Sequence, residues 1–362
     1  MSTSSPPFIS NKANKAFPTE LIDQIIDYNH DDRNTLLAIA AVAKQWTASS
    51  RFHLFSSIEV SYDNGRQLIQ LLSSPHCTFA ATIRRLDIRL VGGSQKWFGE
   101  FSKRLKQFDK VIIEALGLMG SRPTVLREEA RTAAVSFYSH LRELIIGPLV
   151  METSLEFAAL VTGLSNLQSL SCAVSFQSAP SFTQAQRLHL PNSLQIVELT
   201  SPSIKSILEL FDQRLSSITS LSLIFMTSGD YPYLKAFLER PNNILRALKI
   251  TMDANISGVS LDTFAELGFR QLTALRVLDI QTTPCMPPPM ILNILKTIPS
   301  SNLRKLKMTP CLTADIVQVD EMLSGGSRIF KHLKKVAIVG EDLTAVRQSM
   351  PRCASQNLLE LR

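Results

Sequence analysis

Few residues in this sequence have the types and spacing that catalysis requires. The six histidines are dispersed, and none stands in the HExxH or HxH spacing that holds a metal ion. The glycine pairs at 92–93 and 325–326 fit neither of the loops that bring backbone N–H groups close to a phosphate. The segment around Ser165 lacks the second glycine of the GxSxG hydrolase motif. We therefore expect no enzyme, no cofactor and no metal, although a Ser/His/Asp triad built from distant loops stays open because geometry alone defines it.

His30, Asp31 and Asp32 form the nearest approach to a metal site, but three polar residues between two helical patterns are more typical of a loop. The five cysteines are odd in number and show no CxxC or Cys/His spacing. They indicate reduced thiols, and hence a cytoplasmic or nuclear protein. The first residues contain no apolar signal region, and the longest apolar run is too short to span a bilayer.

The composition is that of a globular protein with a Leu-rich core. The chain has 362 residues, of which 45% are hydrophobic and 19% are charged, enough for one long domain or two ordinary ones. This apolar fraction excludes a disordered chain. The net charge of +7 allows a nucleic-acid partner, but the basic residues are spread along the chain without the aromatic–basic motifs of RNA modules. We therefore rank nucleic-acid binding low.

Residues 17–54 predict a small module of three short helices, after a segment over 1–16 that we expect to be disordered. Pro18 suits the start of a helix, and Leu21, Ile25 and Tyr28 recur at helical spacing. A second helix contains Leu36 and Leu37, and a third is expected over 47–54. A module this small makes a poor core by itself, so it requires a partner or a neighbour.

This segment resembles an F-box, and it is most similar to the F-box-like proteins of mushroom-forming fungi. The run Phe17-Pro18-Thr19-Glu20-Leu21 is similar to the opening of the motif, and Val42-Ala43-Lys44-Gln45-Trp46 is similar to its second half. Asn29 departs from the pattern, because it falls where the family has an apolar residue. The resemblance implies docking to a Skp-family adaptor, and through it to a cullin–RING ligase. The positions implied to contact the adaptor or support the contact are Phe17, Pro18, Leu21, Ile25, Ile26, Leu36, Leu37, Val42 and Trp46.

From residue 55 onward one phrase returns: apolar, two variable, apolar, one variable, apolar. It occurs about eleven times at a mean spacing of about 28 residues, which is typical of leucine-rich repeats. The last two apolar positions share one face of an extended strand, and several returning segments show helical spacing. We therefore predict an α/β fold, with the helical module followed over 55–362 by a leucine-rich-repeat solenoid with a curved parallel sheet and a helical convex side. The third phrase, Phe108/Val111/Ile113, competes with one long helix over 97–118, and the tail after Gly340 is expected to cap the array.

An F-box-like module ahead of repeats resembles the substrate receptors of Skp–cullin–F-box ubiquitin ligases, in which the repeats bind the target protein. The alternative is a protein-binding scaffold outside any ligase, with the helical module serving only as a cap of the solenoid. Basic residues at and near the strands offer a candidate target-binding strip for an acidic or phosphorylated segment. A solvated rim explains the same residues equally well. The strip comprises Arg246, Lys249, Arg276, Arg304, Lys305, Lys307, Lys334 and Lys335.

Overall fold

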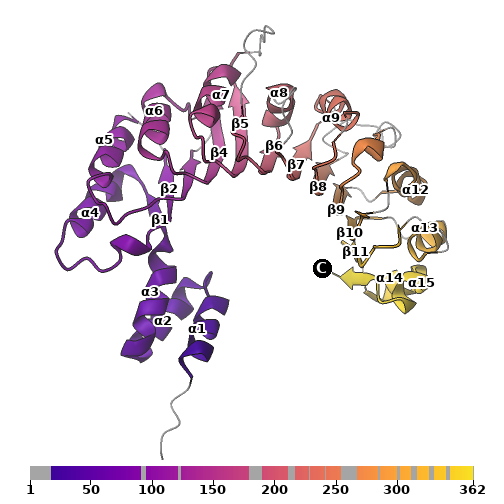
Figure 1. Cartoon of the computed structure of the whole chain (residues 1–362), viewed down its shortest axis with the longest axis horizontal. Coiled ribbons are helices and arrows are strands. Elements are labelled where there is room, and N and C mark those ends of the chain that lie inside the picture. The colour runs from indigo at the N-terminus through magenta and orange to yellow at the C-terminus, as the bar shows by residue number, and fades with distance from the viewer. Residues whose placement is uncertain are drawn as a thin grey trace, which may run out of the picture.

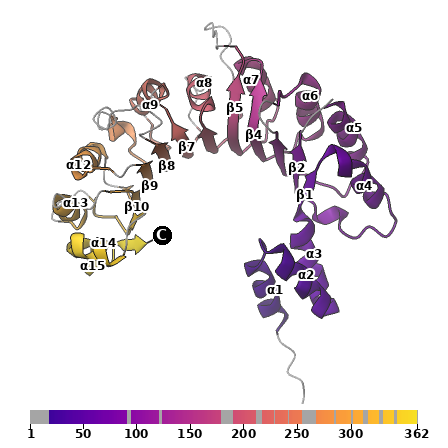
Figure 2. The ribbon, with the colours of Figure 1, turned by 180° about the vertical axis from the view of Figure 1, so that it is seen from behind.

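The computed structural model shows a helical module followed by an open arc of repeating strand–helix units (Figure 1). The structure describes residues 18–90, 95–120, 124–178, 190–210, 217–227, 229–240, 242–253, 267–283, 286–299, 302–310, 316–325, 330–339 and 343–361. The predicted disordered segment over 1–16 and Phe17 lie outside these residues. The view from behind shows the same arc, with the helical module at one end and the C-terminus at the other (Figure 2).

The inner side of the arc is one sheet of twelve parallel strands, whose order in space follows their order in the sequence. Each strand from β2 to β11 therefore pairs with the strand of the preceding repeat and with that of the next, and β1 and β12 form the two edges. The strands are β1 Ser57–Val60, β2 Arg85–Arg89, β3 Ala115–Met119, β4 Glu143–Met151, β5 Ser169–Phe176, β6 Ile196–Thr200, β7 Ser220–Met226, β8 Ala247–Asp253, β9 Val277–Thr283, β10 Lys305–Met308, β11 Lys335–Ile338 and β12 Leu359–Leu361.

Helices return the chain along the outer side of the arc (Figures 1 and 2). They are α4 Tyr62–Leu72, α5 Lys96–Leu105, α6 Glu128–Phe137, α7 Ser154–Thr162, α8 Ser203–Leu210, α9 Tyr231–Leu238, α12 Pro288–Thr297, α13 Ile316–Leu323, α14 Leu343–Ser349 and α15 Pro351–Ser355, with short 3-10 turns η2 Ala80–Thr82 and η4 Phe269–Gln271. The predicted α/β solenoid, with a curved parallel sheet and a helical convex side, is confirmed.

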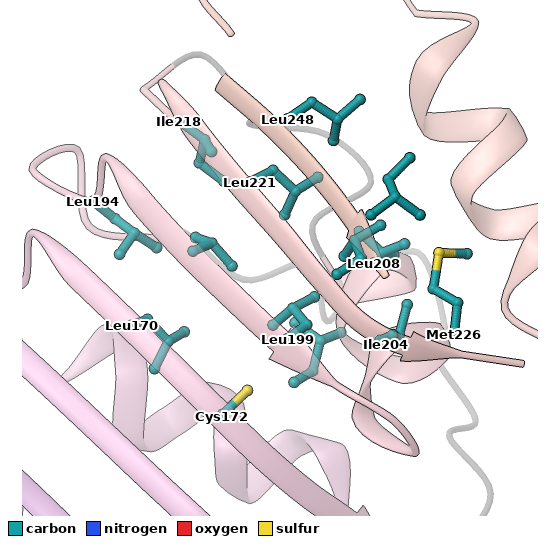
Figure 3. Packing of buried hydrophobic residues seen from close by; sticks show 14 of the residues in the cluster. Leu170, Cys172, Leu194, Leu199, Ile204, Leu208, Ile218, Leu221, Met226 and Leu248 are labelled. Atoms are coloured by element: carbon teal, nitrogen blue, oxygen red, sulfur yellow. The ribbon is translucent and has the colours of Figure 1, made fainter. Parts of the chain in front are cut away.

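The core is built by the apolar positions of the repeated phrase, which stack in register from strand to strand. Leu221 of β7 pairs with Leu248 of β8, which pairs with Leu278 of β9, and all three are buried. Figure 3 shows how such side chains meet residues of the returning helix, among them Ile204 and Leu208 of α8. Each fully buried aliphatic side chain contributes about 1.5–3 kcal/mol. Because one repeat cannot bury its own apolar face, this stability depends on the neighbouring repeats.

A second regular feature is the row of residues just before the strands. The carbonyl of Arg246 accepts the N–H of Arg276 at 2.7 Å and that of Val277 at 2.9 Å. The carbonyl of Arg276 accepts the N–H groups of Arg304 and Lys305 in the same way, at 2.8 and 3.0 Å. Paired hydrogen bonds of this kind recur between successive repeats, so the residues that precede the strands form a continuous row along one edge of the sheet.

The prediction for the third repeat is wrong. The strand β3 begins at Ala115, and its inward residues are Leu116 and Leu118, which pair with Leu86 and Ile88 of β2. The phrase therefore reads Ile113/Leu116/Leu118, five residues later than predicted. The long-helix alternative also fails, because α5 ends at Leu105. The error has a physical cause: Phe108 and Val111 are apolar because they pack against the core from the connecting loop.

The residues after Gly340 do more than the predicted cap, because they add another helical return and a twelfth strand. Val336 of β11 pairs with Leu359 of β12, and Ile338 pairs with Leu361. The phrase is hidden in the sequence because Gln356 occupies the position where Leu333 stands in the preceding repeat. This unit carries Glu360 onto the same face as the lysines of β10 and β11.

Candidate binding surfaces

The described residues contain no group of three or more His, Cys, Asp or Glu that could hold a metal ion. One hollow of about 440 Å³ is lined by Ser102, Asp109 and His140, but no hydrogen bond in the described part of the chain joins these three residues. Ser102 instead pairs with the Tyr138 hydroxyl at 3.1 Å. The pKa of Tyr138 is raised by burial, so its phenol stays neutral and structural.

Two further findings concern the thiols and the membrane. Burial raises the pKa of the Cys172 thiol to about 12, which leaves almost no thiolate for nucleophilic attack at neutral pH. Burial also raises the pKa of Cys353. Among the described helices, none combines the length and the apolar character needed to cross a bilayer.

The helical module consists of α1 Thr19–Tyr28, α2 Arg33–Val42, the 3-10 turn η1 Lys44–Trp46 and α3 Thr47–Ser56. Its own core is a cluster of four buried side chains with Ile39, Trp46 and Phe55 packed against it. Such a core is small for an independent domain. The buried members are Ile22, Ile26, Leu36 and Leu54.

Two polar contacts fix α1 against α3. Ser49 donates its hydroxyl hydrogen to Asp23 at 2.6 Å, and His53 Nε2 lies 2.7 Å from Asp27 Oδ1. Asp23 and Asp27 are spaced i, i+4 on α1, and Ser49 and His53 have the same spacing on α3, so the two contacts lie one helical turn apart. Together with the buried isoleucines, they commit one face of α1 to the module itself.

The neighbouring face of α1 is apolar and exposed. Leu21, Ile25 and Tyr28 stand at i, i+4 and i+7, and their exposed fractions are 44%, 49% and 88%. On α2, Leu37 and Val42 are also exposed, at 50% and 68%. The row of exposed apolar side chains along α1 indicates a surface that a partner could cover.

The structure thus divides the nine positions implied by the F-box resemblance. Ile26 and Leu36 belong to the core of the module, and Trp46 packs against that core with its indole N–H buried and unpaired within the described residues. Pro18 stands immediately before α1, and its carbonyl accepts the N–H groups of Leu21 and Ile22. Phe17 lies outside the described residues. The positions left exposed are Pro18, Leu21, Ile25, Leu37 and Val42.

Asn29 does not interrupt the exposed apolar face of α1. It directly follows Tyr28, at which α1 ends, and its side-chain amide donates to the carbonyl of Ile25 at 2.7 Å. Folded back in this way, the amide satisfies a helix-end carbonyl that has no partner inside the helix. The departure of Asn29 from the apolar pattern is therefore explained by its contact at the end of α1.

The module and the solenoid have separate cores. The cluster around Ile26 does not merge with the cluster that runs through the repeats. The module contacts the solenoid where Phe55 of α3 stacks on Phe79, with ring centroids 4.6 Å apart, and where Arg51 of α3 donates to the Thr78 hydroxyl at 3.4 Å. The helix α3 then passes directly into β1 at Ser57.

The predicted basic strip divides into two rows. Arg246, Arg276, Arg304 and Lys334 are consecutive members of the row that precedes the strands, and all four are exposed. Their side chains form no ion pair or side-chain hydrogen bond with the described residues. We call these four residues the basic ladder. At about 4.8 Å per strand, the ladder spans about 14 Å.

The inner row is largely neutralised. Lys305 and Lys335 pair with Glu360 Oε2 at 3.2 and 3.6 Å, and Lys307 pairs with Asp279 at 3.5 Å. Lys249 is half-buried and lies in register with Asp279. The sequence could not reveal the role of Glu360, because that required recognition of the twelfth strand.

The same rows differ at the other end of the arc. The row that contains the basic ladder begins with Ser56, which is followed by Arg84, Glu114 and Arg142. These last three residues alternate in sign, and Arg84 Nε lies 3.8 Å from Glu114 Oε1. On the strands, Arg85 pairs with Glu143 and Arg89 with Glu59, at 3.3 and 2.6 Å. Within this row, consecutive basic residues without an acidic neighbour therefore occur on the C-terminal limb of the arc, from β8 to β11.

Sequence reasoning placed Tyr28 on the apolar face of α1 but left it out of the candidate positions, although it is the most exposed residue of that face. Its i+7 spacing from Leu21 was the available signal. Phe52 of α3 is also exposed, at 46%, and no pattern in the sequence marked it.

Comparisons with known proteins place the chain in no family. No family model matches the sequence, and no curated protein is significantly similar to it. Among solved structures, this chain is similar to a chain of the yeast complex titled "Crystal structure of Rad7 and Elc1 complex in yeast", with 14% sequence identity and a TM-score of 0.42. The match covers 94% of this chain and 89% of that chain. A likeness at this level does not extend to function.

Proposed function

We propose that this protein is the substrate-recognition adaptor of a Skp–cullin–F-box type ubiquitin ligase. In this proposal the helical module docks a Skp-family adaptor, which connects it to a cullin–RING ligase, and the repeats bind the target protein. The observation that carries the proposal is the exposed apolar face of α1, because Leu21, Ile25 and Tyr28 are not used by the core of the module.

The geometry of α1 supports a docking role. Ile22 and Ile26 lie one residue after Leu21 and Ile25, so the two pairs occupy neighbouring faces of one helix. The face with Ile22 and Ile26 packs into the core of the module. The face with Leu21 and Ile25 leaves apolar surface in contact with water, which is unfavourable, and a bound partner would remove that contact. The exposed Leu37 of α2 adds to the surface available.

The alternative function is a protein-binding scaffold in which the module only caps the solenoid. A cap is expected to share its core with the first repeat, since its purpose is to cover the apolar end of the array. Here the two cores are separate and meet through the Phe55–Phe79 pair. This separation favours docking over capping.

The test is adaptor binding by the full-length chain, measured by isothermal titration calorimetry with a purified Skp-family adaptor. Ile25→Asp places a charge in the centre of the exposed face, and we expect at least a tenfold loss of affinity, as for other central interface residues. Because Ile25 is not in the core of the module, circular dichroism should show an unchanged fold.

The matched control is Leu71→Asp, which places the same charge at an exposed leucine of α4, on the solenoid. It should leave adaptor affinity unchanged. Equal losses in the two variants would show that the effect is not specific to α1. Unchanged binding by the Ile25→Asp variant would move the docking surface away from α1 and leave the proposal without its main support.

A further inference from the structure

We propose that the basic ladder binds an acidic, extended segment of the target protein. The inference deepens the proposed function, on which it rests for the role of the solenoid as target receptor, by naming the class of segment that is recognised. Each ladder residue stands immediately before one of the strands β8 to β11, on the limb of the arc that leads to the C-terminus (Figure 1).

The first argument is the missing counter-charge. Four basic residues stand on adjacent rungs of one hydrogen-bonded row, and like charges on neighbouring rungs repel. On the other limb the equivalent row alternates in sign. On the strands next to the ladder, Lys305, Lys307 and Lys335 already have carboxylate partners. The ladder is thus the row on this limb that lacks negative charge among the described residues.

The second argument is geometry. The ladder spans about 14 Å, and an extended peptide advances about 3.3–3.6 Å per residue. A run of four or five residues therefore covers the ladder. The arginines at three of the four rungs can each hold a carboxylate through two N–H groups, which a lysine cannot do.

The surroundings favour an acidic peptide over nucleic acid. Single-stranded nucleic acid is held by aromatic side chains on which bases stack, in addition to positive charge. The strands beside the ladder present Ala247, Val277, Lys305 and Lys335 at their first positions, and none of these is aromatic.

The test is fluorescence anisotropy of full-length protein with a labelled peptide of about eight residues rich in Asp and Glu, the length that covers the ladder with a margin at each end. The comparison probes are the same peptide with Asn and Gln in place of the acids, and a single-stranded oligonucleotide of similar length. The acidic peptide should bind more tightly than both. Its affinity should fall several-fold as salt rises to a physiological level, because exposed charges are screened beyond about 8 Å there.

The informative variant is the double substitution Arg276→Glu and Arg304→Glu, for which we expect about a tenfold or larger loss of peptide affinity, since each reversal replaces an attraction with a repulsion. Arg276→Gln with Arg304→Gln should give a smaller loss in the same direction, without introducing new charge. The matched control is Arg142→Glu, because Arg142 is exposed and belongs to the same row but lies between Glu114 and Gln168. It should change affinity less than about twofold.

Four results would overturn the proposal: the double reversal binds like the wild type, Arg142→Glu loses as much, the neutral peptide binds as tightly, or the oligonucleotide binds more tightly through the same residues. Adaptor binding, measured on the same preparations, separates this proposal from the function on which it rests. Loss of peptide binding with adaptor binding intact concerns the ladder alone. If the wild-type chain binds the peptide but not the adaptor, the proposal for the ladder stands and the proposed role in a ubiquitin ligase fails.

Discussion

Truncation of Leu248 to Ala tests the phase of the repeated strand most sharply. Leu248 is 1% exposed and lies in register between Leu221 and Leu278. The change removes three carbon groups, worth about 0.8 kcal/mol each, or about 2.4 kcal/mol in transfer free energy. The hydrogen-bonded strands on both sides limit collapse of the cavity, so we expect a total loss of about 3–4 kcal/mol in unfolding free energy.

The control is Arg246→Ala, two residues before Leu248 and immediately before β8 begins. Arg246 is exposed and its side chain forms no bond with the described residues, so its removal should change the unfolding free energy by less than about 0.5 kcal/mol. The assay is urea unfolding followed by circular dichroism, with the slope of the transition compared between variants. Similar losses at both positions, or none at Leu248, would refute the assigned phase and with it the stacking of this limb.

Three further predictions concern other parts of the chain. In the third repeat, Leu116→Ala should lower the unfolding free energy measured in urea by about 2–5 kcal/mol, and Val111→Ala should lower it clearly less, because only Leu116 belongs to the strand. A larger loss at Val111 would instead support the repeat phrase Phe108/Val111/Ile113. Hydrogen bonds from the side chain and the backbone N–H of Thr35 lower the pKa of Asp32. The ionised carboxylate therefore stabilises α2 above the ordinary pKa of 3.8, and this stabilisation is lost as the pH falls below that value. The Asp32→Asn variant should lose less stability than the wild type as the pH is lowered through this range. Peptide mapping after mild alkylation of native protein should find Cys77 modified before Cys172, whose pKa is about 12, and equal rates would contradict the buried position of Cys172.

The fold was predictable because its signal is local and repeated. Each strand presents the same three apolar positions, and the parallel pairing of neighbours follows from repetition alone. The third repeat was misplaced because two overlapping phrases share Ile113, and only packing distinguishes the strand from the loop. The twelfth strand was missed because Gln356 breaks the phrase, although Leu359 and Leu361 retain their spacing.

The binding surfaces were predictable in composition but not in exposure. Leu21, Ile22, Ile25 and Ile26 are all apolar, and periodicity alone cannot say which of two neighbouring helix faces turns inward. That choice depends on α3, which meets α1 through Asp23 and Asp27. On the solenoid, sequence spacing placed the basic residues together. Their division into a neutralised row and a ladder that has no carboxylate partner among the described residues depended on carboxylates contributed by other strands.

The central claim is that the helical module docks a Skp-family adaptor, and direct titration of the full-length wild-type chain with that adaptor tests it most plainly. The account predicts a one-to-one complex with a dissociation constant of about 1 μM or tighter, a free energy of about −8 kcal/mol, which a central cluster of exposed apolar residues can supply. The Ile25→Asp variant should be weaker by at least tenfold. A wild-type chain that is folded by circular dichroism and shows no heat of binding and no co-elution with the adaptor would contradict the account, and the scaffold function would then replace it.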